Sequence, residues 1–317
     1  MEPILNETQR YTLLPIKYPK IWNLYKKQLS NFWISSEIDF SKDKNDWDTK
    51  LSEEEKYFLK NVLAFFASSD GLVGINILDN FSKEIKIYEA QITYNFQCTM
   101  EGIHSEVYSI MIETYIDNAK EKEILFNAIS EIPCIKEKGD WIMKWIYDDN
   151  INLARRLVAF IIVEGLFFSG SFCSIFWIKQ RGILNGLTKS NEFISRDETM
   201  HTEFGCLIYS MLENKLEENI VHNMFKEAVI IETKFITESL PVRLIGMNSS
   251  LMTQYIEYVA DKLLTDLGYK IYYNTNNPFP FMKNMGLESR SNFFDERSTV
   301  YQKSLMQKDS LTQVEDF

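Results

Sequence analysis

The distribution of proline most constrains the fold of this 317-residue chain. Between residues 20 and 240 there is a single proline, Pro133. The other six lie outside this span: Pro3, Pro15, Pro19, Pro241, Pro278 and Pro280. Proline disrupts the interior of a helix, so its scarcity permits long helices. The span is rich in Leu, Ile, Glu, Lys and Phe, with apolar residues at helical spacing, and we therefore predict an all-α fold.

Turn residues and caps divide this span into helices joined by short connections. Ser52 followed by three glutamates resembles a helix N-cap with an acidic first turn, and we predict a helix from there through Phe65. The other expected helices are 21–31, 68–84, 88–117, 120–131, 134–147, 152–180, 189–213, 216–238 and 247–266. We expect residues 1–20 to form an irregular arm and 21–285 a helical domain.

The last residues, 286–317, are polar and lack helical periodicity, which predicts a flexible tail. Such a tail is either a frayed terminus or a peptide that docks on a partner.

Composition excludes some classes of function. The net charge is −11, which disfavours a nucleic-acid partner, since phosphates would be repelled. The four cysteines are widely spaced and form no CxxC pair, as expected of free thiols in a reducing compartment. The N-terminal residues contain no basic segment followed by an apolar core, so we expect no secretory signal and predict a cytoplasmic protein.

The segment Met100–Ile116 carries Glu101, His104 and Tyr108 at helical spacing. Because each helical residue advances by about 100°, Glu101 and His104 lie about 60° apart, and Tyr108 follows one turn after His104. One helix thus offers two candidate metal ligands and a phenol beside them.

A second Glu-x-x-His pair occurs at Glu198 and His201. The chain has only three histidines, and two of them follow a glutamate at this spacing. Paired Glu-x-x-His motifs, with one carboxylate from each of two further helices, are typical of a di-metal carboxylate bundle.

Glu164 is the candidate carboxylate of a third helix. It is the one charged residue in the apolar run 157–178, which at 22 residues is long enough to span a membrane. A single glutamate at the middle of that run would be costly in lipid or in a dry core unless a cation neutralised it. We favour a buried metal ligand over a protonated or salt-bridged core glutamate, and over a membrane anchor.

Asp70 is the candidate of the fourth helix, because it lies inside an apolar run between Asn61 and Phe81. A helix-capping or chain-reversal role remains an alternative for Asp70. The complete predicted ligand set is Asp70, Glu101, His104, Glu164, Glu198 and His201. Oxygen and nitrogen donors in this mixture suit iron or manganese better than structural zinc.

Four segments in this order, FFASSDG, MEGIHSEVYS, VEGLFFSGSF and ISRDETMH, closely resemble the small, radical-generating subunit of class I ribonucleotide reductase. The resemblance covers nearly the whole chain and is greatest to the subunits of eukaryotes and large DNA viruses. It implies a ferritin-like di-iron carboxylate helical bundle with extra helices. It also implies that the six residues hold two iron ions with an Fe-O-Fe bridge, and that these react with O2, although manganese stays possible.

The resemblance also assigns a radical site. Tyr108 aligns with the radical tyrosine of the family, and Phe168, Phe172 and Ile194 align with the apolar pocket around it. Considered without the resemblance, all four would be ordinary core residues.

Three residues match the family's radical-transfer route. Asp197 is expected to hydrogen-bond His104, and Trp33 to extend the path toward the surface. Tyr301 matches the residue that passes the radical across the subunit interface. Without the resemblance Trp33 would be a packing residue and Asp197 an acid on a helix surface or beside the ligands.

The resemblance implies partners as well. They are a large catalytic subunit, to which the tail docks with Phe317 as its anchor, and a second copy of the chain in a homodimer. The radical would then serve the reduction of ribonucleotides to deoxyribonucleotides for DNA synthesis. Two other functions remain open: a ferritin-like di-metal oxidase or iron-handling protein, and a non-enzymatic helical interaction protein.

Overall fold

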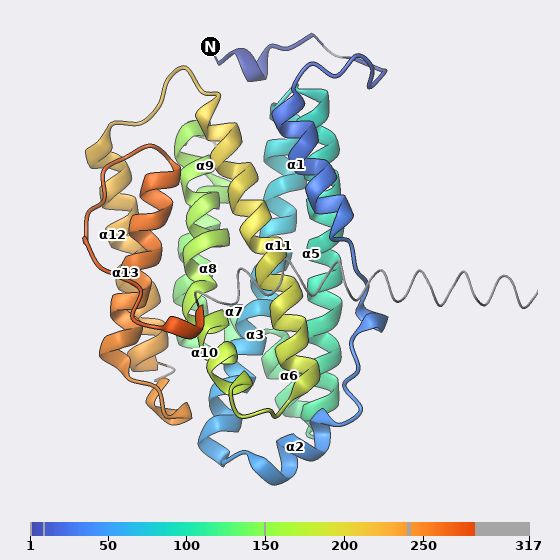
Figure 1. The fold of residues 1–317 in the computed structure, drawn as a ribbon, viewed down its shortest axis with the longest axis vertical. Helices are drawn as coiled ribbons and strands as arrows, with labels where there is room; N and C mark the ends of the chain where they lie inside the picture. The colour runs from blue at the N-terminus through green and yellow to red at the C-terminus, as the bar shows by residue number, and fades with distance from the viewer. Residues whose placement is uncertain (1, 9, 149, 240–241, 283–317) are drawn as a thin grey trace, which may run out of the picture. The chain divides into compact units, whose positions relative to one another are not determined.

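A computed structural model of the chain describes residues 2–8, 10–148, 150–239 and 242–282 (Figure 1). In these residues the regular structure is helical and contains no strand, which confirms the all-α class. A compact helical unit ends at Pro278, and residues from Phe279 onward form a second unit, of which 279–282 are described. The limits expected at residues 20 and 285 remain predictions.

The α-helices of the first unit are α1 Pro19–Ser30, α2 Asp43–Lys50, α3 Glu53–Asn76, α4 Ser82–Glu84, α5 Tyr88–Tyr115, α6 Ala119–Phe126, α7 Ala128–Glu131, α8 Pro133–Tyr147, α9 Leu153–Ile162, α10 Ser169–Lys179, α11 Asn185–Ser210, α12 Glu218–Lys234 and α13 Ser249–Asp266. The described residues also contain the π-helical segments η3 Ile77–Phe81, η4 Val163–Phe167 and η5 Phe235–Ser239. Their 3₁₀ turns are η1 Pro3–Leu5, η2 Ser35–Glu37 and η6 Val242–Ile245.

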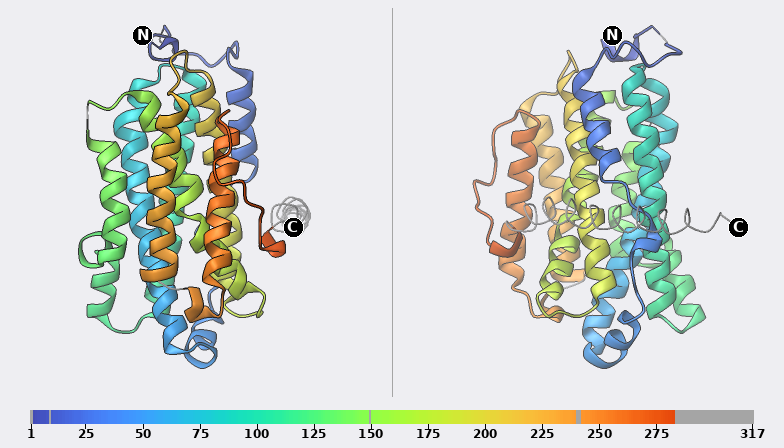
Figure 2. Two further views of the ribbon diagram at one scale, coloured as in Figure 1. Left: turned by 90° about the vertical axis from the view of Figure 1, so that its left-hand side faces the viewer. Right: turned by 45° about the vertical axis from the view of Figure 1, so that its right-hand side comes forward.

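The long helices of this unit run side by side, as the views in Figures 1 and 2 show. Helix α3 packs along α5, and α11 packs against α5, α9, η4 and α10. These elements form the centre of the bundle, and each of the predicted metal ligands lies on one of them. α12 and α13 pack against one another and against η4.

We predicted that one helix ends at Phe65 and the next begins at residue 68. This prediction is wrong, because helical structure continues from Glu53 to Glu84. Ser68 and Ser69 do not interrupt it, since their hydroxyls each donate to the carbonyl one turn before, at 2.8 Å. This bonding satisfies the two side chains inside the helix. Asp70 therefore lies within α3, and the capping or chain-reversal alternative for Asp70 is wrong.

The helix start expected at Ser52 is confirmed. The backbone N–H of Glu55 donates to Ser52 Oγ at 3.2 Å, and the N–H of Ser52 donates to Glu55 Oε2 at 2.8 Å. This reciprocal capping box satisfies two N–H groups that the first turn leaves without helical partners.

The apolar run around Glu164 forms α9, η4 and α10, which agrees with the helix expected over 152–180. In its most apolar stretch 94% of the residues are buried, and the corresponding value for Glu53–Glu84 is 72%. Both apolar helices are therefore core helices of the bundle, consistent with a soluble protein, and the membrane-anchor alternative is not supported.

Residues Asp43–Lys50, which we did not predict to be helical, form α2. This helix fixes the start of α11. The Asp43 carboxylate accepts hydrogen bonds from the N–H groups of Gly186 at 3.0 Å and Leu187 at 2.8 Å, and Asp46 accepts from the N–H of Leu184 at 3.1 Å. A negative charge is favourable at a helix N-terminus. These contacts hold the helix that carries Asp197, Glu198 and His201.

The N-terminal arm is attached to the bundle by a buried glutamate at the start of α5. Glu89 accepts from the N–H of Lys17 at 2.8 Å and forms an ion pair with Arg10. At the other end of the arm, Glu2 accepts from the N–H groups of Glu213 and Asn214. The described part of the arm is thus tethered to the bundle at two points.

Candidate metal centre

Four central elements of the bundle bring the six predicted ligands together. Each of these side chains is at most 3% exposed. They are Asp70 on α3, Glu101 and His104 on α5, Glu164 on η4, and Glu198 and His201 on α11. The two Glu-x-x-His pairs, Asp70 and Glu164 therefore form a single buried cluster.

His104 lies at one end of this cluster. Its Nδ1 atom is 3.0 Å from Glu198 Oε1, 3.4 Å from Glu101 Oε2 and 4.0 Å from Asp70 Oδ2. One imidazole nitrogen and three carboxylates from three helices thus surround one point.

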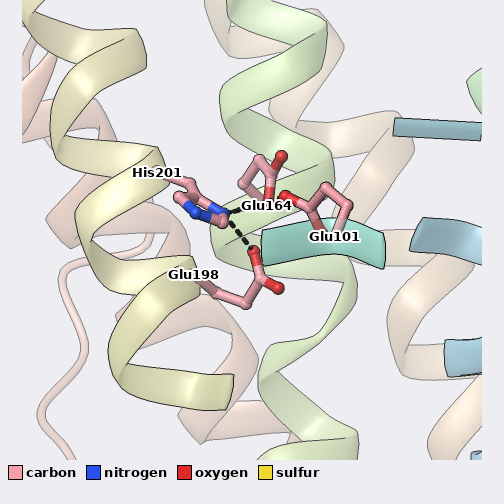
Figure 3. Close-up of side chains that lie close together, drawn as sticks. All are labelled: Glu101, Glu164, Glu198 and His201. Atoms are coloured by element: carbon pink, nitrogen blue, oxygen red, sulfur yellow. Dashed lines mark hydrogen bonds and ion pairs between the residues drawn. The ribbon is translucent and has the colours of Figure 1, made fainter. Parts of the chain in front are cut away.

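His201 lies at the other end (Figure 3). Its Nδ1 atom is 3.0 Å from Glu101 Oε1, 3.1 Å from Glu198 Oε2 and 3.9 Å from Glu164 Oε2. Glu101 and Glu198 therefore each present one oxygen to His104 and the other to His201. The two carboxylates lie between two adjacent sites.

The donor atoms of this cluster fit two cations. They form two groups, each within 4.8 Å, which share Glu101. Several buried donor atoms have no hydrogen-bond partner among the described residues: Asp70 Oδ2, both oxygens of Glu101, Glu164 Oε2, Glu198 Oε1 and His104 Nδ1. Burial of unpaired carboxylates is strongly unfavourable unless a cation balances them. Four carboxylates and two imidazoles match the donors of a two-metal carboxylate centre.

The pKa values of the buried ligands reflect the same crowding of negative charge. Burial raises the pKa of Asp70 and Glu164 well above the ordinary range, and neighbouring carboxylates raise it further. Burial opposes the charged form of His104 and His201, but the surrounding carboxylates outweigh this effect and raise the pKa of both. Without metal the cluster therefore binds protons, and metal binding must release them.

Asp197 orients His104 from outside the cluster. Its Oδ2 atom lies 3.2 Å from His104 Nε2 and accepts a hydrogen bond from Trp33 Nε1 at 2.6 Å. The Trp33 and His104 rings are stacked with centroids 6.0 Å apart. A carboxylate on the outer imidazole nitrogen leaves Nδ1 facing the carboxylates. A continuous set of contacts thus leads from Trp33 to the cluster.

Tyr108 lies one turn after His104 on α5 and is 3% exposed. Its ring stacks on Phe66 with centroids 4.9 Å apart, and Phe66 in turn contacts Phe168 at 5.7 Å and Phe172 at 5.0 Å. Burial, and the charge of Asp70 next, raise the pKa of Tyr108 well above the ordinary value. The phenol is therefore held protonated within an aromatic pocket.

Sequence reasoning missed two residues at this site. Phe66 contacts Tyr108 directly, and the Gln97 amide donates to Glu164 Oε1 at 3.2 Å. Both could have been found, because Phe66 precedes Asp70, and Gln97 precedes Glu101, by one helical turn.

Three further predicted residues do not appear in these contacts. Ile194 is buried on α11. Tyr301 and Phe317 lie outside the described residues, so their roles remain predictions.

The family model described as "Ribonucleotide reductase, small chain" matches residues 10–278. The chain belongs to this family. The small chain of ribonucleoside-diphosphate reductase from Spisula solidissima is 53% identical over 304 residues, which cover 96% of this chain and 79% of that one. The corresponding chain of Vaccinia virus (strain Ankara) is 52% identical over 304 residues, which cover 96% and 95%. The predicted membership in the reductase small-subunit family is thus confirmed, and the oxidase or iron-handling alternative is not favoured.

The fold of the family agrees with that of this chain. The Rnr4 homodimer of Saccharomyces cerevisiae matches with a TM-score of 0.82 and 38% sequence identity, covering 95% of this chain and 93% of that one. The predicted ferritin-like bundle is confirmed. Family membership also supports a dimetal centre in the cluster of carboxylates and histidines.

Proposed function

We propose that this chain, as the small subunit of a ribonucleoside-diphosphate reductase, forms a radical on Tyr108 and supplies it to a large subunit that reduces ribonucleotides. The observation that carries the proposal is the position of Tyr108. The buried phenol follows His104 by one turn on α5, next to six donor residues that have several unpaired atoms.

Two iron ions are the proposed occupants of the cluster, and manganese suits the same donors. Asp70, Glu101 and His104 would hold one ion, and the group of Glu101, Glu164, Glu198 and His201 the other. When bound and supplied with O2, the ions provide the oxidising equivalent for removing one electron from a nearby phenol.

The protein keeps the Tyr108 phenol protonated and in a dry environment. Because the pKa of the phenol is raised, loss of an electron must be accompanied by loss of the hydroxyl proton. Phe66, Phe168 and Phe172 pack beside or behind the ring and exclude water and small reductants from it. Exclusion of these reactants would let the radical persist.

The contacts between Trp33, Asp197 and His104 provide a route for the electron. The Asp197 carboxylate touches both rings, so it can keep them aligned while charge moves between them. We propose that Tyr301 continues the route to the large subunit, as the family resemblance implies.

The proposed assembly has two kinds of interface. We infer that residues 286–317 dock on the large subunit with Phe317 as anchor, and a synthetic peptide of the last residues should then inhibit reductase activity competitively. We also infer a homodimer, the state that the yeast Rnr4 structure is named for, and sedimentation at one chain mass would contradict it. The proposed compartment is the cytoplasm.

Isotope labelling tests the radical. Metal-free protein containing β-deuterated tyrosine is loaded with ferrous iron, exposed to O2, and examined by electron paramagnetic resonance beside unlabelled protein. We expect about two metal ions per chain and an organic radical signal whose hyperfine splitting collapses on deuteration. A fully loaded protein without an organic radical, or with a signal unaffected by the label, would contradict the proposal.

A further inference from the structure

A buried ion pair binds the backbone at residues 167 and 170, shortly after Glu164, and none of the proposed steps uses it. Lys138 on α8 donates to Glu232 Oε2 on α12 at 2.6 Å, and both side chains are fully buried. The ammonium also lies 3.6 Å from the ring centroid of Phe65 and 4.1 Å from that of Phe235. The pair is thus enclosed by aromatic rings in the core.

Burial makes this pair a poor source of stability. It lowers the pKa of Lys138 to about 8 and raises that of Glu232, although each partner opposes the shift of the other. Replacement of a buried ion pair by apolar side chains of similar size is often neutral or stabilising. Stabilisation of the fold therefore does not account for this pair.

Both partners also bind one short piece of backbone. Lys138 Nζ donates to the carbonyl oxygen of Phe167 at 2.6 Å, and Glu232 Oε1 accepts from the N–H of Gly170 at 3.2 Å. The approach of Glu232 requires a glycine, because a Cβ at position 170 would lie 2.7 Å from Glu232 Oε1. The ion pair thus spans the junction between η4 and α10.

This junction directly follows the π-helical segment that carries Glu164. A π turn interrupts the regular hydrogen bonds of an α-helix and is often found at functional sites. Lys138 binds the last residue of η4, Phe167. The next residue, Phe168, places its ring against Phe65 and Phe66.

We propose that Lys138 and Glu232 are positioning residues that hold the backbone of 163–170, and so place the Glu164 carboxylate in the metal cluster and the Phe168 ring in the pocket. The pair acts from behind η4 and touches neither the ligands nor Tyr108 through any contact described above. The expected effect on metal binding rests on the proposed function. The expected effect on the backbone of 163–170 concerns the metal-free chain alone.

The double variant Lys138→Met/Glu232→Leu removes the charges and both backbone contacts while it fills the space with apolar groups. We expect the thermal midpoint to stay the same or rise. Hydrogen exchange of the metal-free protein, followed by mass spectrometry, should become about tenfold faster in 163–170, because hydrogen bonds to charged groups are lost there. Affinity for Mn²⁺, titrated by electron paramagnetic resonance, should fall about tenfold or more.

A control comes from the same two helices. Lys234 and Glu137 form an exposed ion pair between α12 and α8, with Nζ and Oε2 2.7 Å apart. The double variant Lys234→Gln/Glu137→Gln should change neither exchange in 163–170 nor affinity for Mn²⁺. Gly170→Ala provides a second route to the same effect, because the new methyl group displaces Glu232 from the backbone. It should also speed exchange in 163–170 and weaken Mn²⁺ binding.

Unchanged exchange in 163–170 for both the Lys138→Met/Glu232→Leu and Gly170→Ala variants would overturn the inference, and so would faster exchange with unaltered Mn²⁺ affinity. Failure of the proposed function is distinguishable from these outcomes. In that case the unsubstituted chain itself would bind no Mn²⁺, whereas exchange in the metal-free protein would still report whether the pair holds this segment.

Discussion

Asp197 holds His104 in the orientation that metal binding requires. The carboxylate lies 3.2 Å from His104 Nε2, so the other ring nitrogen, Nδ1, faces Glu101 and Glu198 at 3.4 and 3.0 Å. Because the same oxygen of Asp197 accepts from Trp33, one residue both orients a ligand and connects it to the outer aromatic ring.

Substitution of Asp197 should therefore separate radical formation from radical use. In Asp197→Asn, the side-chain amide can still contact one of the two rings, but the negative charge that lies between Trp33 Nε1 and His104 Nε2 is lost. We expect Tyr108 to be oxidised in a substantial fraction of chains, whereas ribonucleotide reduction with a large subunit falls at least tenfold. Radical content per chain and turnover are measured on the same sample. Full turnover would contradict the proposed route.

Glu101 should matter to both metal ions. Its two oxygens face different histidines, so Glu101→Ala is expected to remove a donor from both sites. Asp70→Ala removes a donor only from the group around His104. Metal analysis after loading should show less than one ion per chain for Glu101→Ala and about one for Asp70→Ala. Equal losses in the two variants would contradict the placement of Glu101 between the sites.

The stability of the metal-free protein should fall as the pH rises. Because the pKa values of Asp70, Glu164, His104 and His201 are all raised, the folded chain binds more protons than the unfolded chain. The histidine contribution is present below the ordinary value of 6.5 and is lost at higher pH; the carboxyl penalty begins above the ordinary values of 3.8 and 4.5.

Thermal unfolding in a chelator checks this dependence. We expect the midpoint to drop by several degrees, roughly the effect of 1 kcal/mol or more, between pH 6 and pH 8. Asp70→Asn should reduce the slope, since one of the crowded acids is gone. A midpoint that rises over this interval would show that the cluster is not protonated in the folded chain.

Phe66 should protect the radical. In Phe66→Leu, loss of the ring that stacks on Tyr108 opens space beside the phenol and removes an aromatic contact worth about 1 kcal/mol. The radical should then decay several-fold faster when hydroxylamine is added. Phe81→Leu is the matched control, because Phe81 is an equally buried ring that packs on Tyr94 and Phe160 instead. Equal decay in the two variants would contradict a protective role for Phe66.

Local spacing predicted most of the ligand set. Two Glu-x-x-His pairs and an isolated glutamate in an apolar run depend only on helical periodicity and on the cost of a buried charge, and both can be evaluated from sequence. The family resemblance added the radical roles, which spacing alone could not assign to Tyr108 among 16 tyrosines.

Tertiary contacts account for what the sequence did not predict. Asp70 was ambiguous because Ser68 and Ser69 resemble a helix end, yet their hydroxyls bond back to the helix. The π segment around Glu164 has no periodic signal of its own. Lys138 and Glu232 are 94 positions apart, and only the packing of α8 against α12 brings them together.

The central claim is that Tyr108 carries the radical, and its replacement tests that most directly. Tyr108→Phe keeps the ring that packs on Phe66 and changes no donor of the metal cluster, so the chain should still bind about two metal ions. After loading with ferrous iron and O2, electron paramagnetic resonance should show the organic radical in the unsubstituted chain and none in Tyr108→Phe. A radical of the same shape and yield in Tyr108→Phe would contradict the account.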